Sequence, residues 1–356
     1  MTGSARSVGV GVVGLGRISG AHLQGYRDSP AASVVAVCDI RDDIAATVAA
    51  EFGAQPHSSL SSLLSDPRID LVDIILPHNL HVSAVLASIR AGKNVLVEKP
   101  LAPTTSACLE LLSSARAAGV TLAVAENTRF VRAYQAAKSL LEAGTLGKIR
   151  LVRSFIYGTE VSRLADPSSW KGRAAGTIGG AILDAGAHTF YLLPWLVGRP
   201  TWVRAYHDRF VPQSEVEDYA IVHGKLESGA AFSSEFTFTA EMPWGERLEI
   251  YGSDASLIID QNHDPAAVVY RGLDDHAGLA VEGVEYSQEW KLGSIAAAVR
   301  DTVEAIATGR TPAVDNRDTA YAVMIAELSY LSARSGGSTV DVPRDLGGIE
   351  QDQTLS

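Results

Sequence analysis

The sequence predicts an α/β protein of two domains, a doubly wound parallel sheet followed by an α+β domain with one large, mainly antiparallel open sheet. At 356 residues, the chain exceeds the usual size of a single hydrophobic core. Its first third alternates short apolar runs with helix-like segments, which is typical of βαβ units. After about residue 127 the runs lengthen and alternate apolar with polar residues, as strands of a half-exposed antiparallel sheet do.

The parallel domain is expected to span residues 1–127. Gly53, Gly92 and Gly119 each follow a helix-like segment, where a left-handed residue commonly ends a helix. The expected strands are residues 8–13, 33–37, 71–76, 94–97 and 121–125, and the expected helices are 20–26, 42–52, 81–91 and 105–118.

The second domain is expected to span residues 128–342, with C-terminal helices that can pack back on the first domain. Residues 343–356 are predicted to be a loose tail. The expected strands are residues 148–157, 201–210, 217–226, 230–239 and 247–251, and the expected helices are 133–143, 292–308 and 318–332.

The composition of the chain argues against several kinds of partner. Asp and Glu number 41 against 30 Lys and Arg, a formal net charge of -11, so a phosphate backbone is not an expected partner. No apolar run approaches the length of a membrane span, and no convincing leader cleavage site follows the apolar start. Cys38 and Cys108 suit reduced, buried thiols, and no spacing of Cys and His predicts a metal site. We therefore expect a cytoplasmic protein.

A glycine-rich loop, Gly14-Leu-Gly-Arg-Ile-Ser19, follows the first expected strand. Gly14 and Gly16 let the backbone turn and approach a pyrophosphate, whose charge suits the N-terminus of the next helix. Arg17 and Ile18 belong to the same loop and are expected to contact the cofactor. With a strand before it and a helix after it, the loop predicts a Rossmann dinucleotide-binding domain. A glycine-rich turn without a ligand is the alternative.

An acidic residue closes the second expected strand. Asp39 stands 20 positions after Ser19, where a carboxylate binds the adenosine ribose hydroxyls. Because a carboxylate repels a 2′-phosphate, the sequence favours NAD over NADP. Arg41 could instead pair with that phosphate, which keeps NADP as an alternative.

Asp184 and His188 are four residues apart, so on one helix they would share a face. A carboxylate beside an imidazole stabilises the imidazolium and makes a proton-transfer unit. The alternative is a capped helix with a buried, hydrogen-bonded histidine, since polar pairs at this spacing are common.

The segment Glu98-Lys99-Pro100 lies where the fourth expected strand leaves its sheet, because Pro100 cannot continue the ladder. The charges can mark a solvated strand end. They can also stand at the carboxyl edge of a parallel sheet, where open α/β folds bind ligands.

From about residue 8 to 335 the chain resembles the glucose–fructose oxidoreductase, inositol dehydrogenase and rhizopine catabolism (Gfo/Idh/MocA) family. The likeness rests on Gly14-Leu-Gly-Arg-Ile18, Leu76-Pro-His-Asn-Leu-His81, Glu98-Lys-Pro100, Glu126-Asn-Thr-Arg-Phe130, Trp170 with Lys171, Gly179-Gly180, Asp184-Ala-Gly-Ala-His188 and Leu248-Glu-Ile-Tyr-Gly252.

The resemblance implies that Lys99, Asp184 and His188 form a catalytic substrate site between the domains, with Pro100 often cis. It also implies that Arg129 and Trp170 bind the substrate. The cofactor contacts that it implies are Pro77, Asn79, His81, Glu98, Lys99 and Asn127. Two departures, Tyr191 where many members have Asp and Pro194 within the expected helix, bear on the shape of the substrate pocket.

The implied activity is oxidation of a secondary hydroxyl of a sugar, amino sugar, glycoside or cyclitol, with His188 or Lys99 as the proton acceptor. The acidic segments SEVED (214–218) and AEMPWGE (240–246) permit an amino-group-bearing substrate. The alternatives are an NADPH-dependent keto-sugar reductase, an NAD-dependent glycosidase and a non-enzymatic cofactor-sensing regulator. We expect a homodimer or homotetramer formed through the C-terminal sheet.

Overall fold

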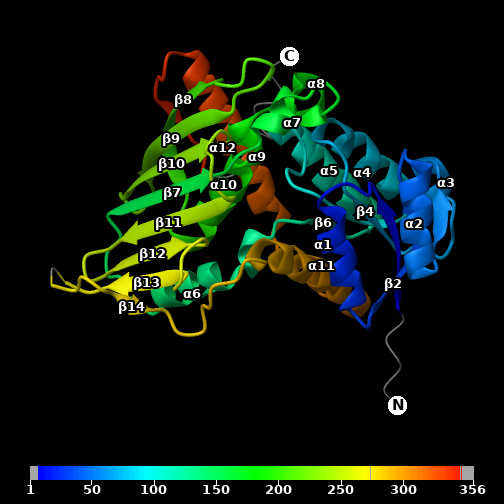
Figure 1. The fold of residues 1–356 in the computed structure, drawn as a ribbon, viewed down its shortest axis with the longest axis horizontal. Coiled ribbons are helices and arrows are strands. Elements are labelled where there is room, and N and C mark those ends of the chain that lie inside the picture. Colours follow the sequence, from blue (N-terminus) through cyan, green and yellow to red (C-terminus); the bar gives the residue numbers. More distant parts are fainter. Residues whose placement is uncertain (1–6, 273, 345, 347–356) are drawn as a thin grey trace. The chain divides into compact units, whose positions relative to one another are not determined.

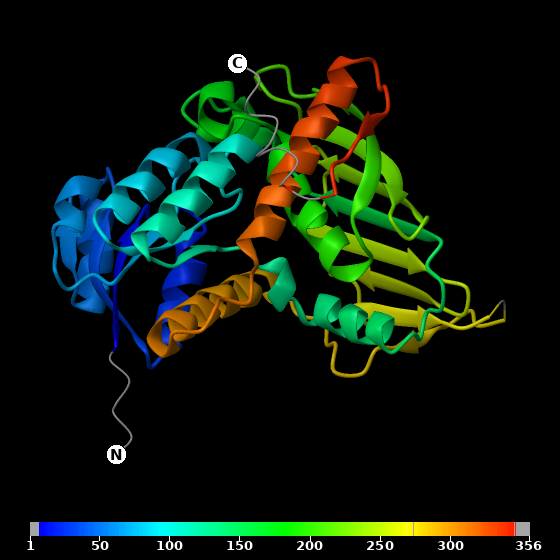
Figure 2. The ribbon, with the colours of Figure 1, turned by 180° about the vertical axis from the view of Figure 1, so that it is seen from behind.

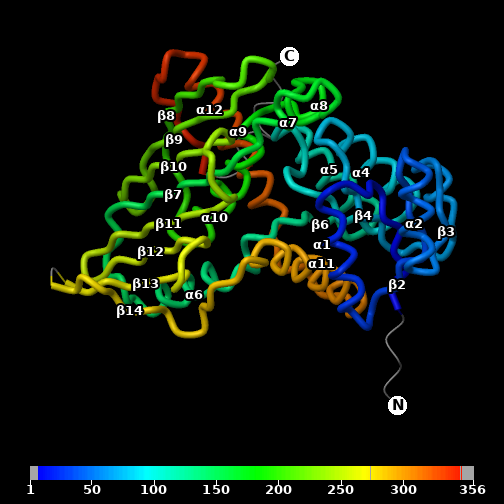
Figure 3. The backbone as a smooth tube through the Cα atoms, viewed as in Figure 1, coloured from blue at the N-terminus to red at the C-terminus, as the bar shows by residue number. Residues whose placement is uncertain are grey.

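The computed structural model describes residues 7–272, 274–344 and 346. These residues form two compact units. The first holds 7–127 together with Lys291–Ala320, and the second holds Thr128–Trp290 and the described residues from Tyr321 onward. The path of the chain through both can be followed in Figure 3. Of the predicted tail, only residues 343, 344 and 346 are described.

The first unit is built on a six-stranded parallel sheet (Figure 1). Its strand order is β3-β2-β1-β4-β5-β6. The chain adds strands on one side of β1 and then, from β4 on, on the other side, and doubly wound sheets bind ligands at this switch between β1 and β4. The parallel ladders bring the carboxyl ends of the strands to one edge of the sheet. The strands are β1 (Val8–Val13), β2 (Ala32–Cys38), β3 (Gln55–His57), β4 (Leu71–Ile74), β5 (Asn94–Val97) and β6 (Leu122–Val124).

Helices α1 and α11 pack against each other in the first unit, as Figure 1 shows. A Cβ on Gly25 of α1 would lie only 2.8 Å from Ala296 O of α11, so the glycine permits this close approach. Val299 and Val303 of α11 join the apolar core made by β1, β2, α1 and α2. The helices are α1 (Ser19–Arg27), α2 (Asp42–Phe52), α3 (Leu60–Leu64), α4 (His81–Arg90), α5 (Thr105–Ala118) and α11 (Trp290–Thr308), with a 3-10 turn η1 (His78–Leu80).

The second unit is built on a nine-stranded sheet of order β14-β13-β12-β11-β7-β10-β9-β8-β15. Its neighbouring strands pair antiparallel, except that β7 and β10 run parallel. The strands are β7 (Leu151–Tyr157), β8 (Pro200–Asp208), β9 (Tyr219–Leu226), β10 (Ala231–Thr237), β11 (Gly245–Tyr251), β12 (Ser256–Asp260), β13 (Ala267–Tyr270), β14 (Leu279–Ala280) and β15 (Val340–Asp341).

Helices α6, α10 and α12 lie along one face of this sheet (Figure 2). Phe190 of α10 meets Phe236 of β10 edge to face, with ring centroids 5.8 Å apart. The helices of this part are α6 (Arg132–Glu142), α7 (Val161–Ala165), α8 (Ala174–Thr177), α9 (Ala181–Asp184), α10 (Gly186–Leu196) and α12 (Asn316–Arg334), with 3-10 turns η2 (Thr128–Phe130) and η3 (Trp170–Gly172).

The sequence did not predict β3, α3 or β12 to β15. Three of these elements have only two or three residues, and α3 has five, too few for a periodic pattern. The predicted strand 148–157 begins only at Leu151. Within the described ranges, no helix is long and apolar enough to cross a membrane.

Candidate active site

The glycine loop joins β1 to α1 at the reversal point of the parallel sheet. Gly14 has φ +92°, and a Cβ there would lie 2.2 Å from Ile75 O, so the fold itself demands glycine. At Gly16 a Cβ would meet nothing within 4 Å. This open backbone is the cradle that a pyrophosphate needs for close approach. Ser19, in place of a third glycine, turns its hydroxyl back to Gly16 O at 2.7 Å.

Ile18, the N-cap residue of α1, makes no side-chain hydrogen bond to the first amides of the helix, where a phosphate would bind. Arg17 is exposed beside it, and Ile18 is half-buried. These features fit a dinucleotide on the loop.

Asp39 is nearly buried at the end of β2, where its carboxylate joins three elements of the cofactor edge. Its Oδ2 accepts from Leu15 N at 2.7 Å, and its Oδ1 accepts from Arg41 N and Nε, both at 3.0 Å. Burial alone would raise the pKa of Asp39, but the hydrogen bonds from Arg41 and Leu15, with the Arg41 charge, lower it below its usual value. The carboxylate is therefore ionised, and Arg41 is paired with it.

Glu98 and Lys99 follow β5 directly, at the same edge of the sheet. The Lys99–Pro100 peptide bond is cis, which confirms what the resemblance implied. Glu98 Oε2 accepts from Lys99 N at 3.1 Å, and the side chain of Lys99 is half-buried. The carboxylate of Glu98 thus holds the backbone from which the Lys99 side chain extends.

His81, a predicted cofactor contact, is completely buried in the structure. The ring nitrogens lie 2.8 Å from Pro100 O and 2.9 Å from Leu76 O. His81 therefore ties the loop after β4 to the loop after β5, and burial lowers its pKa. Pro77, half-buried, directly precedes the η1 turn, Asn79, exposed, lies in it, and His81 directly follows it.

Asn127 ends the first stretch of the first unit and is almost completely buried. Its Nδ2 donates to Ser294 Oγ of α11 at 2.8 Å. The structure thus anchors this predicted cofactor residue to α11.

In the second unit Asp184 is the last residue of α9, and α10 begins at Gly186. The predicted single helix is therefore two helices joined at Ala185. Asp184 and His188 are both nearly buried, and the His188 N–H bonds to Ala185 O at 3.2 Å. The burial of His188 is also what the alternative, a hydrogen-bonded structural histidine, would show.

Lys171 belongs to a stretch that resembles the family, but its sequence alone predicts no role for it. Its Nζ forms an ion pair with Asp184 Oδ2. The ammonium also lies 5.1 Å from the centre of the Phe238 ring and 5.8 Å from that of Trp170. Aromatic faces attract a cation, so the rings and the carboxylate together hold the ammonium beside Asp184. Trp170 itself is half-buried.

Glu217 is a second residue that the sequence did not single out, and it fixes the start of α9. Its Oε1 accepts from Gly180 N and Ile182 N, both at 3.1 Å, and from the Tyr330 hydroxyl at 2.6 Å. A Cβ on Gly180 would lie 1.9 Å from Glu217 O, so this contact requires glycine. Burial raises the pKa of Glu217. These bonds set the position of the helix that ends in Asp184.

The SEVED segment (214–218) is only partly exposed, since of its three acidic residues Glu215 lies at the surface and pairs with Arg173. Glu217 and Asp218 are both buried, and Asp218 accepts from the backbone N–H groups of Phe210 and Val211.

Tyr191, the departure from the family pattern, contacts Arg129. Arg129 Nη1 donates to the Tyr191 hydroxyl at 3.4 Å, and its Cζ lies 5.2 Å from the centre of the Trp195 ring. Pro194 lies inside α10, which runs on to Leu196. A hydroxyl and an indole thus face the guanidinium of Arg129.

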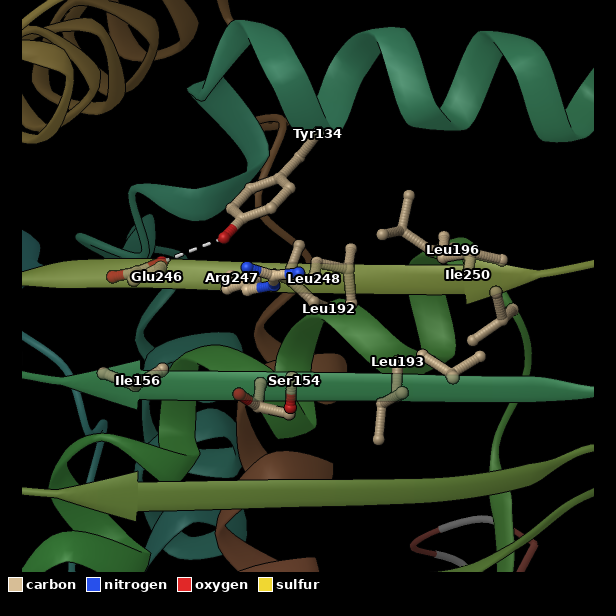
Figure 4. Close-up of a pocket in the computed structure, with 13 residues that line it drawn as sticks. Tyr134, Ser154, Ile156, Leu192, Leu193, Leu196, Glu246, Arg247, Leu248 and Ile250 are labelled. Atoms are coloured by element: carbon tan, nitrogen blue, oxygen red, sulfur yellow. Dashed lines mark hydrogen bonds between the residues drawn. The ribbon is translucent and has the colours of Figure 1, made fainter. Parts of the chain in front are cut away.

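A separate cavity lies between α6, α10 and the large sheet (Figure 4). Its volume is about 10 Å³, room for one water, and apolar side chains such as Leu192 and Ile250 dominate its lining. The Tyr134 hydroxyl donates to Glu246 Oε2 at 3.1 Å across it. It is a packing feature and not a substrate site. Among the described residues, no cluster of three or more His, Cys, Asp or Glu could hold a metal ion.

Comparisons with known proteins agree with this geometry. Residues 8–126 match the oxidoreductase family with an NAD-binding Rossmann fold, and residues 134–258 match the Gfo/Idh/MocA C-terminal domain. A Streptomyces violaceoruber dTDP-3,4-didehydro-2,6-dideoxy-α-D-glucose 3-reductase is 31% identical over 272 residues, 75% of this chain and 76% of the relative. The chain belongs to the Gfo/Idh/MocA family of oxidoreductases.

Other family members cover more of the chain at lower identity. Thermotoga maritima myo-inositol 2-dehydrogenase is 24% identical over 332 residues, 92% of this chain and 95% of the relative. The crystal structure of GenD2 from gentamicin A biosynthesis in complex with NAD superposes with a TM-score of 0.83 at 25% identity, covering 95% of this chain and 97% of that one. The Rossmann unit of this Gfo/Idh/MocA chain is thus an NAD-binding domain.

Proposed function

We propose that this chain is an NAD-dependent dehydrogenase that oxidises a secondary hydroxyl of a sugar, amino sugar, glycoside or cyclitol. The observation that carries the proposal is the buried Asp184, ion-paired to Lys171 and four residues from His188, in an oxidoreductase chain with an NAD-binding domain. A protein that only sensed the cofactor would need the glycine loop but not these groups.

NAD, when bound, supplies the hydride acceptor. The glycine loop would hold its pyrophosphate, and Asp39 would hold its adenosine ribose. The family resemblance implies that Glu98 and Asn127 lie toward the nicotinamide end. Because Arg41 is already paired with Asp39, a 2′-phosphate would meet an ionised carboxylate, so NAD is preferred over NADP.

In the proposed reaction His188 accepts the proton of the substrate hydroxyl. Lys99 donates a hydrogen bond to the same oxygen and stabilises its developing negative charge. Asp184 orients both groups and balances their charge.

Arg129 and Trp170 are the proposed substrate-side residues. Arg129 would lend its remaining N–H groups to substrate hydroxyls, while Tyr191 and Trp195 fix its direction. The named relatives act on inositol and on a deoxy-sugar nucleotide, which supports a polyhydroxylated ring as the substrate class. The second of these is named a reductase, which favours keto-sugar reduction as the second candidate function.

The test is NADH formation, followed by absorbance at 340 nm, across a panel of inositols, aldoses, amino sugars and anhydro-sugars with NAD and with NADP. The proposal expects NAD reduction by at least one member of the panel. Oxidation of NADPH by keto-sugars alone would favour the reductase. Release of the aglycone from aryl glycosides without net NADH would favour the glycosidase.

We also propose that the chain forms a homodimer or homotetramer through the large sheet, and that it works in the cytoplasm. Tyr206 and Phe210 at the end of β8 are 57% and 59% exposed, which supports a further protein surface there. Cys38 and Cys108 are both thiols, which supports a reducing compartment. Light scattering on the purified protein tests the assembly.

A further inference from the structure

His22, on α1, is completely buried between two carboxylates from different strands. Its Nδ1 lies 2.9 Å from Asp73 Oδ2 on β4, and its Nε2 lies 2.9 Å from Glu98 Oε1 at the end of β5. The Tyr26 hydroxyl, one turn along α1, donates to the same Asp73 oxygen at 2.8 Å. A helix and two strands of the cofactor domain therefore meet at one imidazole.

The geometry favours a charged imidazole. Each ring nitrogen faces a carboxyl oxygen, and an ionised carboxylate only accepts hydrogen bonds, so a ring between two ionised carboxylates carries a proton on both nitrogens. Asp73 is 0% exposed, and its Oδ1 has no hydrogen-bond partner, so a nearby cation offsets a large desolvation penalty. Burial alone would lower the pKa of His22, but the charges and hydrogen bonds of Asp73 and Glu98 raise it to about 10.

The same cluster reaches the lysine that the proposed mechanism uses. Glu98 Oε1 is held by His22, and Glu98 Oε2 accepts the backbone N–H of Lys99. The orientation of the Lys99 peptide thus depends on a carboxylate whose other oxygen is fixed by a group on α1.

We propose that His22 is a positioning residue of the dehydrogenase, which as an imidazolium clamps Glu98 and so directs Lys99 toward the reacting oxygen. The proposal rests on the proposed function, because it gives Lys99 a part in the chemistry. In this role His22 is a charged residue on α1 that affects the rate of hydride transfer without touching substrate or cofactor.

The rival explanation is a purely structural tie, in which His22 holds α1 on the sheet and nothing more. Two substitutions separate these roles. In His22→Gln the side-chain amide can take the place of Nε2 and still donate to Glu98. In His22→Asn the amide can take the place of Nδ1 and donate only to Asp73. Both lose the cation and one hydrogen bond, so their losses of stability should be similar.

The experiment measures kcat, KM and the melting temperature of both variants on the substrate found in the panel, with NADH affinity measured by fluorescence. We expect His22→Asn to lower kcat about 10- to 100-fold, the effect of a small misplacement of a reacting group. His22→Gln should keep kcat within about threefold, with KM and NADH affinity little changed in either variant. Equal losses of kcat in the two variants, or full activity of His22→Asn, would overturn the proposal.

A second measurement needs neither a variant nor a substrate. The ¹⁵N chemical shifts of the His22 ring in the wild-type protein should report both nitrogens protonated at pH 8. A neutral ring at that pH would overturn the proposal even if both variants misfold. A charged ring in a protein that oxidises no member of the panel would leave the clamp standing and reject only the dehydrogenase.

Discussion

Lys171 Nζ is ion-paired with Asp184 Oδ2, and the two residues come from separate segments, the η3 turn and the end of α9. Both side chains are nearly buried. Removing one partner of a buried ion pair leaves the other charge uncompensated, so the pair ties Asp184 to Lys171. In the proposed mechanism, where Asp184 orients His188, Lys171 would act as a positioning residue for Asp184.

Lys171→Met is expected to destabilise the fold by about 3 kcal/mol, because it leaves a buried carboxylate without its cation. It should also lower kcat/KM more than tenfold by releasing Asp184. Lys171→Arg keeps the charge and is the matched control, with kcat/KM within a few-fold of wild type. Thermal unfolding and steady-state kinetics on the three proteins check this. Equal activity of the Met and Arg variants would show that the ion pair does not serve the reaction.

The two glycines of the phosphate loop should fail in different ways. Gly14→Ala places a Cβ against Ile75 O at a left-handed backbone, so it should cost more than about 2 kcal/mol even without cofactor. Gly16→Ala meets no protein atom and should leave the melting temperature unchanged while weakening NADH binding at least tenfold. Unfolding scans with and without NADH separate the two losses. A Gly16→Ala protein that bound NADH normally would show that the pyrophosphate does not need the open backbone at Gly16.

Cofactor preference should follow the charge of Asp39. Asp39→Asn keeps an acceptor for Leu15 N but removes the negative charge, and it frees Arg41 for a 2′-phosphate. We expect kcat/KM for NAD to fall about tenfold and that for NADP to rise, by the loss and gain of a charge-assisted hydrogen bond. Adding Arg41→Met to this variant should abolish the gain with NADP. Comparison of NAD and NADP reduction in the three proteins is the measurement, and an unchanged preference for NAD would contradict the role of Asp39.

The stability of the protein should fall as the pH rises above neutrality. The pKa of His22 is raised from 6.5 to about 10 in the folded protein, chiefly because its two carboxylates outweigh the effect of burial. Its contribution is therefore complete below pH 6.5 and is lost as the pH rises toward 10, by at most about 1.4 kcal/mol per pH unit. Urea unfolding at pH 6 to 10 measures the slope. The His22→Gln protein should have a flatter profile, and parallel profiles would refute a charged His22.

The sequence predicted most of the fold because its signals are local. The glycine loop, its flanking strand and helix, and Asp39 all lie within about 32 residues, so their spacing alone defines the cofactor edge. The large sheet was predicted as a class from the alternation of its longer strands, and its short edge strands were missed.

The rest of the site depends on partners that are distant in the chain. Nothing in the Trp170-Lys171 dipeptide tells which carboxylate the lysine meets. Glu217 looked like part of an acidic surface because its donors, Gly180 and Ile182, lie some 35 residues away. The motif around His81 likewise gives no sign that its ring nitrogens bond to Pro100 O and Leu76 O in two different loops.

Two lysines that flank β5 allow a direct test of the role proposed for Lys99. Lys99 follows the strand at the cofactor edge, whereas Lys93 precedes it and donates to Ile69 O at 2.8 Å. Single-turnover NADH formation is to be measured for wild type, Lys99→Met and Lys93→Met, with NADH affinity measured in parallel. The proposed role predicts that Lys99→Met loses at least about 1,000-fold in rate while binding NADH normally, and that Lys93→Met reacts like wild type. A Lys99→Met protein that forms NADH within tenfold of the wild-type rate would contradict it.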